Sequence, residues 1–223
     1  MNDSQRRKFD KFQRESVFMS DNAADFPLNT SGDKVAKDLA TLIADIQTLD
    51  AAQTSGFDDK RQSHALKNSA VGNLRKSLEL MSFAAKAFAD EVPGTEEKFR
   101  LPRSQNEQIL LAKARSFHAD AAPLEAKFVE YGLPADFLAG LQADIDAFEQ
   151  AAEAADSAGE SHAEATGALT EAFKRGMTLT RKLEAIVKIK YRDNAGKLAA
   201  WTSASHLERA PQRRNDQPAP PTP

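Results

Sequence analysis

The stretch Val35–Leu49 reads VAKDLATLIADIQTL, and its apolar side chains decide the fold class. They recur at alternating intervals of four and three residues: Val35, Leu39, Leu42, Ile46 and Leu49. This spacing puts an apolar side chain on the same face at each turn of an α-helix, as in the seam of an antiparallel bundle. The stretch therefore predicts an amphipathic helix that packs against other helices.

The centre of this stretch has a counterpart 99 residues further along the chain. Residues 40–46 read ATLIADI, and residues 139–145 read AGLQADI. The same offset aligns residues 74–78 (LRKSL) with residues 173–177 (FKRGM), which agree in size and charge. A repeat of this length predicts a duplicated three-helix unit, with pseudo-repeats over about 3–92 and 102–192.

Similar apolar patterns predict an all-α fold: an antiparallel bundle of about six helices with a four-helix core. The expected helices span about 3–21, 33–56, 59–91, 104–131 and 161–191, and a further one, carrying Leu138 to Ala155, follows a Pro start at Pro134 and ends before residue 157. Turns are expected near Gly56 and over 157–160, and Pro123 is expected to kink the fourth helix. The first helix should be capped by Asp3 or Ser4, and the fourth by a capping box of Ser104 and Glu107.

Residues 1–210 are expected to form a single helical-bundle domain that ends in an amphipathic extension over 193–210. The polar, Pro-rich tail over 211–223 is expected to be disordered. The chain has 39 alanines, while Leu, Ile, Val and Phe make up about a fifth of it, so the predicted core is thin and Ala-rich.

The composition also limits the chemistry and the compartment. The sequence has no cysteine, which excludes disulfides, thiol catalysis and Cys-ligated metals. No apolar stretch follows the charged N-terminus, and no run approaches the ~18 apolar residues of a membrane span. A cytoplasmic location without membrane contact is the resulting expectation.

Charge is divided unevenly along the C-terminal half. Residues 135–165 contain eight acids and no Lys or Arg, whereas residues 171–198 contain eight bases against three acids. One interpretation is that two adjacent antiparallel helices of opposite sign pair with each other. The alternative is that the bases face nucleic acid, together with the basic residues of 3–21 and the tail. The net charge of −3 and the lack of stacking aromatics near these bases disfavour nucleic acid.

The four histidines do not form a metal-binding pattern. None of His64, His118, His162 and His206 follows a Glu by three residues, as a di-iron bundle site requires. No glycine-rich loop that could cradle a phosphate is present. We therefore expect no catalytic residue, no cofactor and no metal.

Two segments are candidates for binding. In FRLPRS (99–104), Arg100, Arg103 and Ser104 lie where an anion or a partner could bind near the N-terminus of the next helix. A purely structural role, in which Phe99 and Leu101 close the end of the bundle, is the alternative.

The second segment is WTSASHLER (201–209). Trp201 and His206 could anchor this extension on the bundle or could face a partner groove. His118 is a further candidate, because it adjoins an apolar Phe just before the kink at Pro123, where a polar group could line a pocket.

Residues 98–104 (KFRLPRS), 133–138 (LPADFL) and 201–206 (WTSASH) together resemble a widespread group of uncharacterised, hypothetical bacterial proteins. The resemblance covers most of the chain except the tail. It implies a soluble, all-helical bacterial protein, and it brings no activity, ligand or catalytic residue with it.

The pattern favours a non-enzymatic helical interaction or scaffold protein that binds an unknown protein partner or forms a homo-oligomer. A nucleic-acid-associated protein using the basic segment 171–198 and the tail is the first alternative. A small-molecule-binding or enzymatic bundle, with its site at the Pro123 kink, is the second.

Overall fold

The computed structural model describes residues 1–104 and 106–208, and the regular structure in that part is entirely helical. Two compact units can be distinguished: unit 1 combines Met1–Gln53 with Glu164–Pro223, and unit 2 is Thr54–Ala163. These boundaries differ from the expected pseudo-repeats, because each unit takes residues from both repeats. The tail over 211–223, predicted to be disordered, lies outside the described residues.

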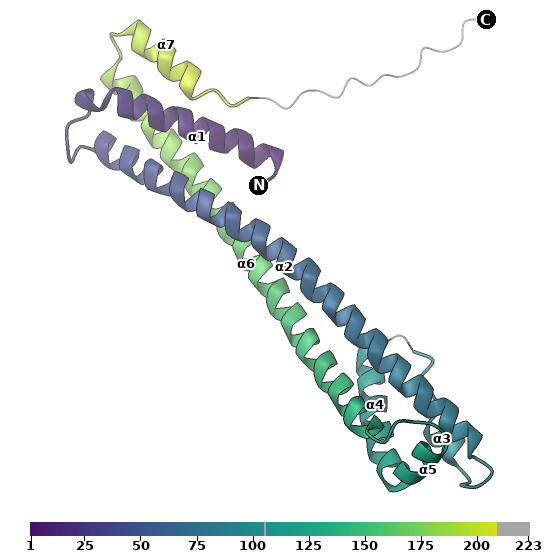
Figure 1. Ribbon diagram of the computed structural model, residues 1–223. Helices are drawn as coiled ribbons and strands as arrows, with labels where there is room; N and C mark the ends of the chain where they lie inside the picture. The colour runs from purple at the N-terminus through teal and green to yellow at the C-terminus, as the bar shows by residue number, and fades with distance from the viewer. Residues whose placement is uncertain (105, 209–223) are drawn as a thin grey trace, which may run out of the picture. The chain divides into compact units, whose positions relative to one another are not determined.

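Two long helices supply residues to both units: α2 spans Ser31–Ala87 and α6 spans Phe137–Lys190 (Figure 1). The turns predicted near Gly56 and over 157–160 are therefore wrong. In place of the four predicted core helices, the structure has two continuous ones. Gly56 serves packing, because a Cβ there would lie 3.5 Å from the Cα of His162. Around 157–160, five alanines within residues 151–158 favour an uninterrupted helix.

In unit 1, α1 spans Asp3–Asp21, as predicted, and is followed by the 3₁₀ turn η1, Ala23–Asp25. Its cap is Asn2 and not Asp3 or Ser4. The Asn2 side chain accepts a hydrogen bond from the Gln5 N–H at 2.9 Å, and the Gln5 side chain accepts one from the Asn2 N–H at 2.9 Å. This reciprocal capping box satisfies two backbone donors at the helix start.

The core of unit 1 is built from α1, the first part of α2, the last part of α6, and α7 (Ala195–Ala204). Leu39, Leu42 and Ile46 of the opening stretch are buried, as their spacing predicts. The predicted C-terminal extension contains α7, whose Trp201 is 2% exposed and packs edge-on against Phe18 with a centroid distance of 5.2 Å. Trp201 therefore anchors α7 on α1.

In unit 2, the segment after α2 contains α3 (Thr95–Lys98), α4 (Glu107–Ala121), the 3₁₀ turn η2 (Ala122–Leu124) and α5 (Glu125–Glu130). The helix predicted to kink at Pro123 is divided there into α4 and α5, with the proline in η2. The predicted cap Ser104 is wrong. Asn106 caps α4 by accepting hydrogen bonds from the N–H groups of Gln108 and Ile109, while Ser104 accepts one from the Asn106 N–H.

Aromatic side chains dominate the core of unit 2. Phe99 is fully buried, with ring centroids of Phe117 and Phe128 at 5.1 and 5.0 Å. This burial agrees with the structural alternative for Phe99, and Leu101 packs half-buried against the same cluster. The segment 99–104 is thus fixed to its unit by its apolar residues.

Gly132 ends α5 with a φ of +96°, a conformation that residues with a Cβ rarely adopt. The Leu133 N–H donates to the Phe128 carbonyl and the Gly132 N–H to the Val129 carbonyl, both at 3.0 Å. These two bonds form a Schellman motif.

We expect Gly132→Ala to lower the free energy of unfolding of unit 2 by about 1 kcal/mol, measured by urea titration followed by circular dichroism. Gly140→Ala, at a helical position with free space, should not do so.

Candidate functional site

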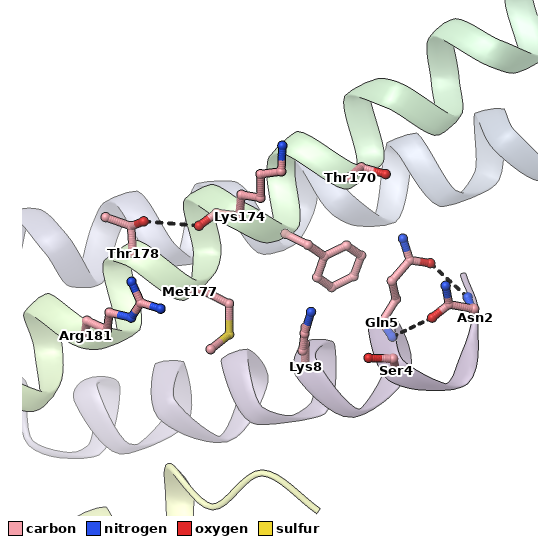
Figure 2. A pocket seen from close by; sticks show the side chains of 10 residues that line it. Asn2, Ser4, Gln5, Lys8, Thr170, Lys174, Met177, Thr178 and Arg181 are labelled. Carbon is pink, nitrogen blue, oxygen red and sulfur yellow. Dashed lines mark hydrogen bonds between the residues drawn. The ribbon is translucent and has the colours of Figure 1, made fainter. Parts of the chain in front are cut away.

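A pocket of 570 Å³ lies between α1 and α6 in unit 1 (Figure 2). The start of α1 supplies one wall, and the residues of α6 after position 169 supply the other. Its lining consists of Asn2, Ser4, Gln5, Lys8, Thr170, Phe173, Lys174, Met177, Thr178 and Arg181. Pockets of this size are typical of ligand sites.

Local packing brings the two helices together beside this pocket. Gly176 has no side chain at the point where the buried ring of Phe12 meets α6, and a Cβ there would lie 2.4 Å from that ring. Phe173 packs against the same ring with a centroid distance of 6.0 Å. The half-buried Met177 gives the pocket an apolar surface, and the buried Phe173 also lines it.

The charged groups of the pocket are all cationic: Lys8, Lys174 and Arg181. Lys174 forms an ion pair with Glu171 at 3.1 Å, and in Figure 2 its ammonium points away from α1. Lys8 rises from α1 toward α6 in the same view. Among the described residues, neither Lys8 nor Arg181 has an acidic partner within ion-pair distance. These two cations are therefore free to attract an anionic group.

The uncharged polar groups are mostly engaged with the backbone. The Thr170 hydroxyl donates to the Thr166 carbonyl at 2.9 Å, and the Thr178 hydroxyl to the Lys174 carbonyl at 3.2 Å. Asn2 and Gln5 are held in the capping box. The lining contains no His, Asp or Glu.

The residues predicted at 100–104 have local contacts in unit 2. Arg100 is exposed and pairs with Glu97 at 3.7 Å, and Arg103 is also exposed. The Ser104 hydroxyl is engaged by the Asn106 N–H at 3.1 Å. Anion binding by these three residues stays a prediction.

The other predicted residues are dispersed between the units. His118 is half-buried on α4 in unit 2. In unit 1 the His206 carbonyl accepts a hydrogen bond from the Arg14 guanidinium at 2.6 Å, and both residues line a second pocket together with Glu208. Trp201 is buried nearby, and its indole N–H has no hydrogen-bond partner among the described residues. The predicted residues therefore fall into separate places: Arg100, Arg103, Ser104 and His118 in unit 2, and Trp201 and His206 in unit 1.

The two charged segments of the C-terminal half do not face each other as adjacent antiparallel helices. Most residues of both segments belong to the single helix α6, so the predicted pairing between them is wrong. The described ion pairs of the basic segment are local, with Glu171, Glu184 and Asp193, while Glu149 of the acidic segment pairs with Arg115. Arg181 is left available for the pocket as a result.

Sequence reasoning identified the bases of both helices without linking them. Lys8 and Arg181 were recognised only as parts of two basic segments, 173 positions apart. A sequence signal exists for Lys8 only, which directly precedes the buried Phe9, because Arg181 lies between Thr180 and Lys182 and has no aromatic neighbour. A buried position determines the direction of the adjacent side chain on its helix. It does not determine which helices pack against each other.

No helix within residues 1–104 and 106–208 carries an apolar run long enough to cross a membrane. In the same residues, no three or more His, Asp or Glu side chains are grouped so that they could hold a metal ion. A scan against protein-family models and searches of curated proteins and of solved structures each gave no match.

Proposed function

We propose that this protein is a helical interaction protein whose unit 1 pocket binds an acidic, amphipathic segment of a partner protein. The observation that carries the proposal is the pair of cations, Lys8 and Arg181, which have no acidic partner within residues 1–104 and 106–208 and lie beside the half-buried Met177. Such a surface matches a helix that presents acids next to apolar side chains, the arrangement of helix-in-groove recognition.

A protein segment fits this pocket better than nucleic acid does. Protein surfaces that bind single-stranded nucleic acid combine a continuous row of Lys and Arg side chains with aromatic rings on which nucleobases stack. Here Phe173 is buried in the core, and Lys174 is already paired with Glu171. The remaining cations match two carboxylates on a helix more closely than a row of phosphates.

We also infer that the chain arose by duplication at the offset of 99 residues. Support comes from burial, because paired positions are buried in both copies: Phe12 and Leu111, Phe18 and Phe117, Leu42 and Leu141, Ile46 and Ile145, Phe88 and Val187. The pocket cations do not follow this pattern. The counterpart of Lys8 is Glu107, which pairs with Lys67 at 2.8 Å, and the counterpart of Arg181 is Ser82. Since neither counterpart is a cation, the helical architecture that the two copies share does not require Lys8 and Arg181. We therefore assign these two cations to binding.

We expect the double change Lys8→Glu and Arg181→Glu to weaken binding of an acidic amphipathic peptide at least tenfold. The probe is an ~18-residue labelled helix of Leu and Glu, about five turns long, followed by fluorescence anisotropy. Each substitution turns an attraction between a cation and a peptide carboxylate into a repulsion. Together the two changes should weaken the binding free energy by about 1.4 kcal/mol or more. A matched control, Lys34→Glu with Lys182→Glu, changes two exposed bases of unit 1 outside the pocket and should retain most of the affinity.

The same variants separate this proposal from the nucleic-acid alternative. A gel shift with a DNA duplex should show no tight binding by the wild type. Tight, steeply salt-dependent DNA binding that disappears in the pocket variant would contradict a protein partner. Equal losses of peptide affinity in the pocket variant and in its control would show diffuse attraction and would also overturn the proposal.

A further inference from the structure

A second surface, in unit 2, is independent of the pocket in unit 1. It is a groove of 240 Å³ between α2 and the start of α6. Its lining is mainly apolar and contains Leu80, Met81, Leu133, Pro134, Phe137 and Leu141. Met81 and Leu141 are almost fully buried and form its base.

The rim of the groove exposes large apolar side chains. Leu80 lines the groove and is 53% exposed. Phe83 follows three residues later on α2 and is 66% exposed. Side chains three positions apart are neighbours on a helix surface, so these two residues extend the apolar surface beyond the groove. Contiguous exposed apolar surface of this kind marks interaction sites.

The shape of the groove depends on two glycines. Gly132 allows the reversal that places Leu133 and Pro134 at one end. Gly140 lines the groove within α6, and a Cβ there would meet no atom within 4 Å. The groove therefore has free space over α6 into which a side chain of a partner can enter.

The charges at the groove are acidic only. Asp136 and Asp144 line it, no Lys or Arg does, and Asp144 is oriented by a hydrogen bond from the Ser77 hydroxyl. Unit 2 as a whole contains 18 acids against 12 bases in residues 54–163. This field attracts a basic partner and repels anionic lipid surfaces and nucleic acids.

We propose that the groove docks a basic, amphipathic helix of a partner protein. One large apolar side chain enters the space over Gly140, and a second, one turn away, covers Leu80 and Phe83. Lys or Arg side chains of the same helix then lie near Asp136 and Asp144. Apolar anchors at helical spacing give such complexes their affinity, and the charges set the partner choice.

The test uses the full chain and an ~18-residue labelled helix of Leu and Lys, about five turns long, in fluorescence anisotropy. Leu80→Ser with Phe83→Ser should weaken binding at least tenfold. Both positions are exposed, so the fold should persist, which circular dichroism checks. Leu66→Ser is the matched control, because Leu66 is similarly exposed on α2 outside the groove.

A second variant fills the groove instead of stripping its rim. Gly140→Leu should also weaken binding at least tenfold, while the unfolding midpoint stays equal or rises because the helix loses a glycine. The proposal is overturned if both groove variants bind like the wild type, or if Leu66→Ser loses as much affinity as they do. The proposal is also overturned if the helix of Leu and Glu binds in this groove. Such binding would appear as a loss of affinity for that helix in the Gly140→Leu variant.

Discussion

Gly176→Ala is expected to lower the free energy of unfolding of unit 1 by about 1–3 kcal/mol, although alanine is the better helix former. The added Cβ would lie 2.4 and 2.5 Å from two atoms of the Phe12 ring. That ring is fully buried between α1 and α6, so it can move only by disturbing the packing around it. Urea titration followed by tryptophan fluorescence measures the loss, because the single tryptophan, Trp201, belongs to unit 1.

Gly167→Ala provides the matched control on the same helix. Gly167 is exposed on α6, and a Cβ there would meet nothing within 4 Å. This change should therefore raise the free energy of unfolding by up to about 1 kcal/mol. Opposite signs at positions 167 and 176 separate steric contact from helix propensity.

A double-mutant cycle with Phe12→Leu identifies the clashing partner. In the Phe12→Leu background, Gly176→Ala should become nearly neutral, which corresponds to a coupling of about 1–3 kcal/mol between the two sites. Additive effects would mean that α1 and α6 do not approach at this point, and the wall of the unit 1 pocket would then have to be reassigned.

The stability of unit 1 is expected to fall by about 3 kcal/mol as pH rises from near 4.5 to above 7, because of Glu15. This side chain is 1% exposed, and burial raises the pKa of its carboxyl from 4.5 to about 7. Glu184 also contributes to the raised pKa, whereas Lys11, 3.6 Å away, and Arg14 oppose it. Between the unfolded and folded pKa values the folded state binds more protons, so the free energy of unfolding decreases with pH.

Glu15→Gln removes the titrating group while keeping its size. The variant should lack this pH dependence and should be more stable than the wild type at pH 8 by up to about 3 kcal/mol. Asp10→Asn, an exposed carboxyl on the same helix, is the control and should retain the wild-type slope. A Glu15→Gln protein with an unchanged slope between pH 5 and 7 would assign the dependence to another group.

Much of the helical structure follows from local pattern. The spacing at 35–49 predicts the burial of Leu39, Leu42 and Ile46, and the predicted bounds of α1, Asp3–Asp21, agree with the structure. The continuity of α2 and α6 could not be predicted in the same way. The sequence predicts a stop at Gly56, yet Gly56 lies within α2, and among the described glycines only Gly94 and Gly132 have a positive φ. Whether a glycine ends a helix or permits contact with a neighbour depends on tertiary packing, which a single sequence does not display.

The candidate sites show the same limit. The bases of α1 and α6 and the apolar side chains of the groove are visible as helix faces in the sequence. Their association depends on which helices meet, as with Lys8 and Arg181 across the Phe12–Gly176 contact. Conversely, Trp201 and Phe99, which attract notice as rare or isolated residues, are buried anchors.

The division of the chain between its units also bears on the order of folding. Unit 2 is one uninterrupted segment, Thr54–Ala163, whereas unit 1 is assembled from the segments before and after it. Joining those two segments in an otherwise unfolded chain means closing a loop of roughly 110 residues, an entropic cost of about 4 kcal/mol. If unit 2 folds first, it shortens this loop before unit 1 forms. Refolding in which Trp201 fluorescence recovers after most of the helical signal is the kinetic sequence that this topology favours.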